Sequence, residues 1–150
     1  MAQTFTSLIY HVVFSTKNRI PCLKPDIREA LFAYMGGIIR NLNAKPILIN
    51  GVDDHAHALV GAPPNLCVSE FVGKLKSNSC GWVHEKWPKL WHFGWQDGYA
   101  AFAVCRSDLN RVYRYIAQQE QHHSRVSFKD ELRRLLHDHG IQFDERYLWD

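Results

Sequence analysis

The chain has 150 residues and a mass of 17.5 kDa, the usual size of one domain with its own hydrophobic core. Its hydrophobic fraction of 46% is that of a globular protein, and no apolar run approaches the roughly 18 residues of a membrane span. The net charge of +3 allows a polyanionic partner without requiring one. The N-terminus lacks the pattern of a signal peptide, so we expect one cytoplasmic domain over residues 1–150 with no membrane partner.

The first half of the chain predicts a strand, a helix and a β-hairpin. Residues 5–15 are rich in β-branched and aromatic side chains, which is typical of a buried strand. A helix begins at Pro25 and carries apolar residues at three- and four-residue spacing as far as Leu42. A hairpin follows, made of a strand, a turn and a second strand: residues 46–50, 51–54 and 55–61.

The second half predicts a long helix, a strand and two further helices. These elements span, in order, residues 67–86, 99–104, 108–121 and 127–139. The last helix opens with a capping signal at Ser127 and stops at Gly140. The order β-α-β-β-α-β with two added helices predicts an α+β fold, in which an antiparallel sheet carries helices on one face in the split βαβ, ferredoxin-like arrangement.

Two histidines occupy alternate positions of the strand predicted at residues 55–61. Side chains two residues apart on a strand point to the same face, about 7 Å apart along the chain. His55 and His57 are therefore close enough to share one divalent metal ion, provided that a third ligand comes from elsewhere in the chain.

Chance and other histidine motifs are the competing explanations. In a chain of this length with nine histidines, the number of His-x-His triplets expected by chance is about 0.5. His137-Asp-His139 is a second triplet, but residues two apart on a helix do not face each other. A histidine-triad hydrolase would carry histidine in place of Leu59. A two-histidine phosphoesterase would carry serine or threonine in place of Ala56 and Ala58.

The helix predicted at residues 108–121 carries a stripe of functional side chains. Tyr115 and Gln119 lie one turn apart on the same face, and Arg111 lies one turn before them. A phenol, a carboxamide and a guanidinium are thereby aligned. Without further information, a half-buried tyrosine between two surface residues explains the same pattern.

Several segments resemble the single-tyrosine HUH transposases of the insertion sequence 200/605 type, a transposase family that includes IS200. The matching segments occur in the same order as in the family and together span nearly the whole chain. Its segments are Tyr10–Arg19, Gly51–His57, Phe71–Lys76, Gly94–Tyr99, Tyr115–Gln119 and Ser127–Trp149.

The resemblance implies a role for each site residue. His55 and His57 match the two metal-binding histidines, Tyr115 matches the nucleophile, and Gln119 matches a third metal ligand. The implied metal is Mg²⁺ or Mn²⁺. Asp54 or its neighbour Asp53 is a candidate for holding the second nitrogen of a histidine, or simply for forming the turn.

The expected activity is that of a DNA transposase. It would cut and rejoin single-stranded DNA at hairpin-marked element ends through a 5′-phosphotyrosine intermediate. The resemblance also implies a homodimer, in which Tyr115 pairs with the histidines of its own chain or of its partner. The candidate DNA contacts are Lys17, Arg19, Lys74, Lys76 and Arg114.

Two alternatives remain open at this point. One is a domesticated relative that trims repeated chromosomal hairpins without mobilising its own gene. The other is a non-catalytic module that binds single-stranded nucleic acid without a metal and never becomes covalently attached to it.

Overall fold

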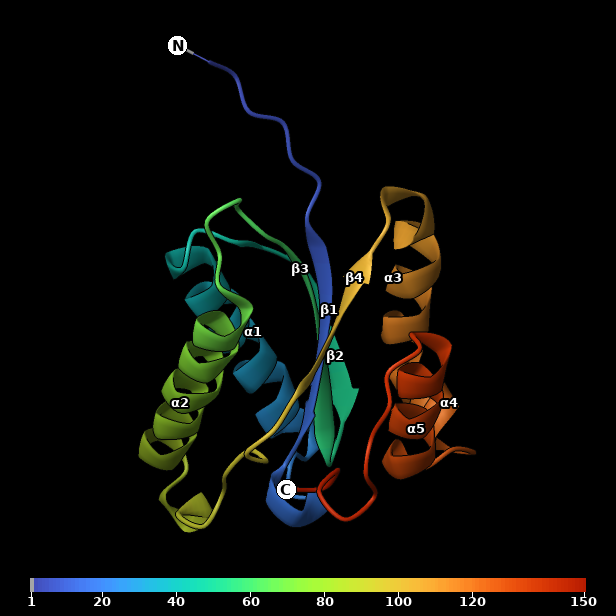
Figure 1. The fold of residues 1–150 in the computed structure, drawn as a ribbon. Coiled ribbons are helices and arrows are strands. Elements are labelled where there is room, and N and C mark those ends of the chain that lie inside the picture. The colour runs from blue at the N-terminus through green and yellow to red at the C-terminus, as the bar shows by residue number, and fades with distance from the viewer. Residues whose placement is uncertain (1) are drawn as a thin grey trace.

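A four-stranded antiparallel sheet forms the middle of the molecule in a computed structural model that describes residues 2–150 (Figure 1). The strands lie in the order β2-β3-β1-β4, and each neighbouring pair is antiparallel. Their bounds are Ile9–Ser15 for β1, Lys45–Val52 for β2, His55–Gly61 for β3 and Ala100–Val104 for β4. The predicted α+β class and β-α-β-β-α-β order are confirmed.

Helices cover both faces of this sheet (Figure 1). The prediction of helices on one face holds for α1 (Pro25–Asn41) and α2 (Val68–Lys86), which share a face of the sheet. The three C-terminal helices lie on the opposite face: α3 (Leu109–Ala117), α4 (Gln119–His123) and α5 (Phe128–Asp138). Among residues 2–150, no helix combines the length and the apolar character that crossing a membrane needs.

Strand alternation divides the buried residues of β1 between the two faces. Val12 and Phe14 belong to the large apolar cluster under α1 and α2. Val13 packs on the other face with Phe102 and the apolar side of α5. Because the side chains on both faces of β1 are buried, the sheet needs a helical layer on each side, and the last three helices supply the second layer.

The first strand is shorter than predicted. It begins at Ile9 instead of residue 5, and the side chain of Phe5 is 85% exposed. Ile9 pairs with Gly61 of β3 and Val104 of β4, the last residues of both neighbouring strands. Residues 5–8 therefore extend past the ends of both neighbours, although the carbonyl of Leu8 still accepts a hydrogen bond from Ala62.

The helix predicted at residues 108–121 is divided into α3 and α4. Gln118, between them, has non-helical backbone angles of φ −102° and ψ 27°. The side-chain amide of Asn50 on β2 donates to the carbonyls of Ile116 and Ala117, at 2.9 and 3.3 Å. Carbonyls at a helix C-terminus need such partners, so a contact from a distant strand supports the break.

The local signals at the ends of α5 are confirmed. The side chain of Ser127 accepts a hydrogen bond from the backbone N–H of Asp130, as an N-cap does. Gly140 follows the helix with a φ of +66°, a left-handed conformation that glycine adopts without steric cost. These two residues fix where α5 starts and stops.

A two-residue turn, Asp53–Asp54, joins β2 to β3 and is tighter than the predicted turn at 51–54. The backbone carbonyl of Asp54 accepts from the N–H of Thr16, and that of Asp53 accepts from the N–H of Leu23. Gly51 pairs with Ala56 across the hairpin, and a Cβ atom on Gly51 would collide with the carbonyl oxygen of His55. The start of β3 is therefore closely constrained.

We expect Gly51→Ala to lower the free energy of unfolding by about 1–3 kcal/mol, because the backbone of the hairpin must shift to admit a methyl group. Gly73→Ala on α2 is the matched control. A Cβ atom there meets no atom within 4 Å, and alanine favours a helix by up to about 1 kcal/mol. Urea denaturation measures both variants, and equal stability of the two would contradict the packing at Gly51.

Candidate functional site

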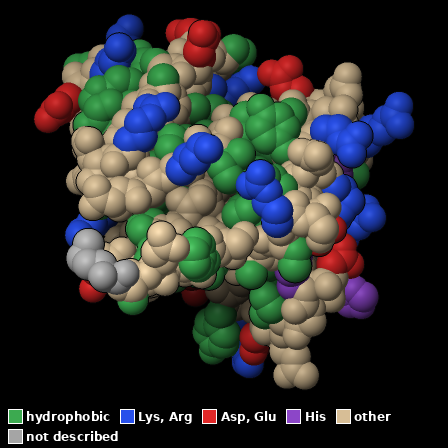
Figure 2. Space-filling view, turned by 90° about the horizontal axis from the view of Figure 1, so that it is seen from above, with side chains coloured by type: hydrophobic (Ala, Val, Ile, Leu, Met, Phe, Trp, Pro, Cys, Tyr) green, Lys and Arg blue, Asp and Glu red, His purple; other side chains and the backbone are tan. Residues whose placement is uncertain are grey.

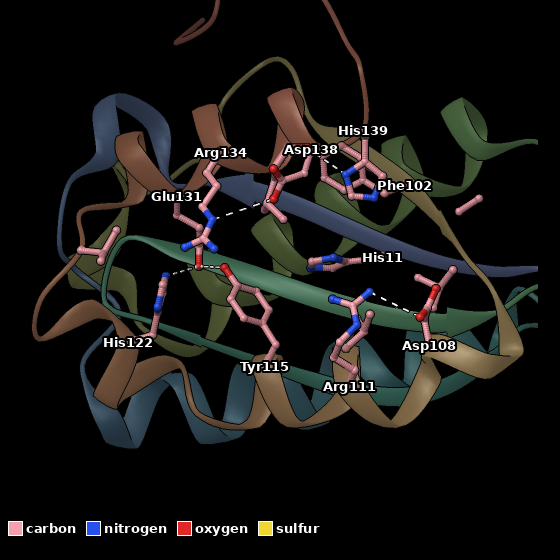
Figure 3. A pocket seen from close by; sticks show the side chains of 15 residues that line it. His11, Phe102, Asp108, Arg111, Tyr115, His122, Glu131, Arg134, Asp138 and His139 are labelled. Carbon is pink, nitrogen blue, oxygen red and sulfur yellow. Dashed lines mark hydrogen bonds and ion pairs between the residues drawn. The ribbon is translucent and has the colours of Figure 1, made fainter.

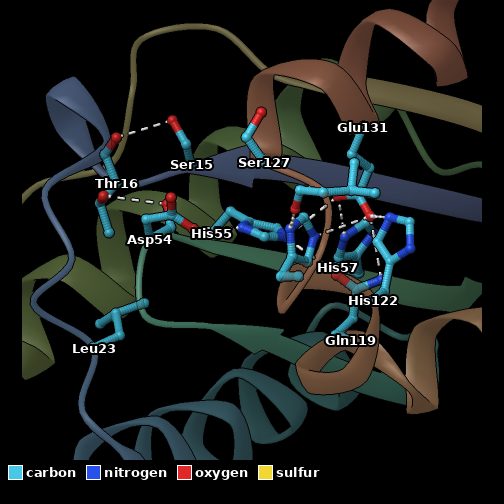
Figure 4. Close-up of polar contacts among 12 residues, drawn as sticks. Ser15, Thr16, Leu23, Asp54, His55, His57, Gln119, His122, Ser127 and Glu131 are labelled. Carbon is cyan, nitrogen blue, oxygen red and sulfur yellow. Dashed lines mark hydrogen bonds and ion pairs between the residues drawn. The ribbon is translucent and has the colours of Figure 1, made fainter.

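His55 and His57 lie side by side on β3, facing the layer formed by α3, α4 and α5. Both side chains are fully buried. They share this face because they are two residues apart on the strand. Ser15 and Val13 of β1 lie opposite them and face the same way. Each imidazole directs its Nε2 atom toward one carboxylate, that of Glu131 on α5, at 3.3 Å for His55 and 3.0 Å for His57 (Figure 4).

The other nitrogen of each imidazole is also held. Nδ1 of His55 lies 2.7 Å from Oδ1 of Asp54, the contact predicted for one of the two turn aspartates. Asp53 contributes its backbone carbonyl to the turn instead. Nδ1 of His57 lies 2.7 Å from Nε2 of His11 on β1, a partner that sequence reasoning missed. Both histidines are thus fixed with Nε2 toward the centre of the site.

Glu131 is the residue on which the site converges, and sequence reasoning also missed it. It belongs to the acidic first turn of α5, where the helix-capping signal already accounted for a carboxylate. Its side chain is only 1% exposed. One oxygen, Oε1, faces His55 and His57, while the other accepts the hydrogen bond of the Tyr115 hydroxyl.

Two histidines of α4 complete the surroundings of Glu131. Nε2 of His122 and of His123 lie 3.2 and 3.1 Å from its Oε2. Within residues 2–150, neither nitrogen makes a hydrogen bond of acceptable geometry, although both are buried. Ligand atoms of His55, His57, His123 and Glu131 all lie within 4.8 Å of one another, which is the spacing of a metal-binding group.

The charges of the site depend on these contacts. Burial disfavours the imidazolium of His55, but hydrogen bonds to Asp54 and Glu131 outweigh it and raise its pKa to about 9. Burial would likewise raise the pKa of Glu131, yet the surrounding histidines hold that pKa well below its usual range. Glu131 is therefore an ionised carboxylate in the interior, stabilised by imidazole N–H groups.

Tyr115 and Gln119 reach the same centre, although they lie on separate helices. Oε1 of Gln119 is 3.2 Å from Nε2 of His55, and its side chain is fully buried. The Tyr115 ring lies edge-on to the His57 ring, with centroids 6.0 Å apart. Burial and the carboxylate of Glu131 raise the pKa of Tyr115 above its ordinary value, so the phenol is held protonated. One chain therefore brings together all four residues predicted for the chemistry.

The five residues predicted to contact DNA do not cluster as the four predicted site residues do. Lys74 and Lys76 are on α2, across the sheet from Tyr115, and Nζ of Lys76 donates to the carbonyls of Asp97 and Gly98. Arg19 donates to the carbonyl of Trp149 and lies against its ring, beside the exposed Lys17. Arg114 is exposed on α3. In Figure 2 the Lys and Arg side chains are spread over the surface and gather on the side where α3 lies.

Known proteins of similar sequence are transposases. The profile of the family described as "Transposase IS200 like" matches residues 4–119. The ISDra2 transposase TnpA of Deinococcus radiodurans is 26% identical over 117 residues, which cover 75% of this chain and 84% of that protein. The transposase for insertion sequence element IS200 of Salmonella typhimurium is 32% identical over 94 residues, 60% of this chain and 59% of that protein.

Solved structures share the fold. A candidate transposase from Deinococcus radiodurans R1 has a TM-score of 0.66 at 23% identity, and the match covers 79% of this chain and 95% of that one. A REP-associated tyrosine transposase bound to a REP hairpin has a TM-score of 0.62 at 16% identity, covering 84% and 74%. Since the family profile spans well over half of the sequence, the chain belongs to the IS200-like transposase family.

Proposed function

We propose that this protein is a metal-dependent transposase that cleaves and rejoins single-stranded DNA at hairpin-marked element ends, with Tyr115 as the nucleophile. The observation that carries this proposal is the position of the Tyr115 hydroxyl. It shares the carboxylate of Glu131 with the two histidines of β3, so a nucleophile and a set of metal ligands meet at one point.

The donor set fits a divalent metal ion. The predicted ligands His55, His57 and Gln119 offer two imidazole nitrogens and an amide oxygen, and the structure adds Glu131 and His123. The buried Nε2 of His123, without a hydrogen-bond partner among the described residues, is a ready ligand atom. Oxygen and imidazole donors together suit Mn²⁺ and also accept Mg²⁺. A bound ion would supply Lewis-acid stabilisation of charge on the phosphoryl oxygens.

Two neighbouring side chains hold the proposed nucleophile, Tyr115, in place. Tyr115 is held between the His57 ring and Glu131, and Oε2 of Glu131 is the acceptor nearest to the phenolic proton. Attack by the phenol oxygen forms its bond to the scissile phosphorus while the bond to the 3′ oxygen breaks. The products are a 5′-phosphotyrosine and a free 3′-hydroxyl, and reversal of the same step rejoins DNA without a nucleotide cofactor.

The substrate and the assembly are part of the same proposal. Tyr115 is only partly exposed, between the sheet and the C-terminal helices, and a phosphodiester held inside a duplex would not fit against it, so the substrate at the cut is single-stranded. The REP-associated relative was solved with a REP hairpin, which supports hairpins as the mark of the element ends. A homodimer would provide two such sites, one for each end.

Tyr115→Phe should abolish the denaturant-resistant protein–DNA adduct and leave the affinity for DNA within about twofold, because only the attacking oxygen is lost. The measurement is a denaturing gel after incubation with hairpin-bearing single-stranded DNA and Mn²⁺. Tyr113→Phe, on the same helix but with its side chain exposed, is the control and should form the adduct as the parent does. An adduct that persists in the Tyr115 variant would refute this nucleophile.

Glu131→Gln should weaken Mn²⁺ binding at least about tenfold, because an anionic ligand at the centre of the site becomes a neutral amide. Isothermal titration of the purified protein with Mn²⁺ measures this directly. Glu145→Gln removes the same charge from a surface pair with Arg133 and should leave the affinity unchanged. If both variants bind Mn²⁺ like the parent, the metal site does not include Glu131.

A further inference from the structure

A cleft of about 480 Å³ opens beside Tyr115, between α3 and α5, with β1 and β4 as its floor (Figure 3). Asp108, Arg111 and Tyr115 line one wall, and Arg134 and Asp138 line the other. Its volume is within the range of small-ligand sites. Because the Tyr115 hydroxyl is at its inner end, whatever occupies the cleft lies next to the nucleophile.

Two arginines reach toward this cleft from opposite walls (Figure 3). Arg111 lies 3.6 Å from Asp108, and Arg134 lies 3.9 Å from Asp138, so neither pair is at hydrogen-bonding distance. Both arginines are largely exposed, at 73% and 80% of the side chain, and such surface pairs contribute about 0–1 kcal/mol. Little is lost when either guanidinium turns to a phosphate, which it can bind through two N–H groups.

Each acidic residue of the cleft has a basic side chain or a histidine beside it. Asp108, which precedes α3, and Asp138 on α5 are the partners of the two arginines. The charge of Glu131 is compensated by the histidines around it. The remaining titratable groups of the lining are His11, His122 and His139, which carry no negative charge.

An aromatic surface lies at the other end of the cleft. The imidazole of His139 stacks on Phe102, with ring centroids 4.2 Å apart and planes inclined by 22°. Phe102 is buried, whereas His139 is exposed. An exposed ring supported from below by a second ring is a suitable surface for stacking a nucleobase.

We propose that this cleft binds one unpaired nucleotide next to the scissile phosphate, with Arg111 and Arg134 holding a phosphate from opposite sides and His139 stacking on the base. The proposal rests on the function proposed above and adds the place of the substrate. Arg111 was part of the sequence stripe with Tyr115 and Gln119, and the cleft gives that residue a role which the metal site does not.

The test measures binding in a Tyr115→Phe background, so that no covalent product forms. The probe is fluorescein-labelled dT12, and fluorescence anisotropy gives its Kd over a range of KCl concentrations. Arg111→Ala combined with Arg134→Ala should raise the Kd at least about tenfold at moderate salt. It should also reduce the slope of log K against log salt by about 0.7, the value for one phosphate contact on a single strand. His139→Ala should raise the Kd about fivefold or more, the loss of one stacked base.

The matched control is Arg133→Ala, which removes the same charge from the neighbouring position on α5. Arg133 is not among the residues that line the cleft, and it pairs with Glu145 at 2.6 Å. It should leave both Kd and salt slope as in the parent. An equal loss of affinity in this control, or no loss in the double variant, would overturn the cleft as a nucleotide site.

The two proposals fail in different ways. If the protein with intact Tyr115 forms the adduct while the arginine variants bind dT12 normally, the activity stands and the cleft does not hold the substrate. If the arginine variants lose binding but intact protein forms no adduct, the cleft is a nucleotide site and the transposase reaction is refuted. Circular dichroism of each variant confirms that the fold is retained.

Discussion

The contacts that stabilise the buried carboxylate of Glu131 connect the sheet to the three C-terminal helices. A lone carboxylate in a protein interior is strongly unfavourable unless hydrogen-bond donors surround it. Here the donors come from separate elements: the histidines of β3, the tyrosine of α3 and Gln119 of α4, and the two histidines of α4 lie within ion-pair distance. The need to satisfy this single charge fixes where α5 packs and holds the short α4 against the sheet.

The sheet makes this convergence possible through its register. His11, His55 and His57 all face the C-terminal helices because β1 and β3 pair with Val13 opposite His57. A shift of one residue in that pairing would send the histidines into the apolar layer under α1 and α2. The tight hairpin at Asp53–Asp54 prevents such a shift, since its carbonyls are bound to Thr16 and Leu23. The turn therefore protects the site as well as the fold.

Local patterns were enough to predict the parts of the fold and site that lie within one element. His55 and His57 share a face through strand alternation. Tyr115 and Gln119 were predicted on one continuous helix and instead lie on α3 and α4, so the family resemblance carried that pair. Residues whose role arises from contacts distant in sequence were missed. Glu131 meets His57 across 74 residues, and its place in a helix-capping pattern already had a local explanation. The break between α3 and α4 was missed for the same reason, since the supporting Asn50 is 66 residues from Ile116.

The tyrosine helix is tied to the rest of the site by contacts within one chain. Tyr115 is held by Glu131 of its own α5, and α3 is anchored by Asn50 and by the buried Ile116 packed on Leu59. Moving α3 away from its own sheet would break these contacts, at the cost of several hydrogen bonds, unless an equivalent helix took its place. The residues predicted for the chemistry therefore meet in this chain without a contribution from a second one.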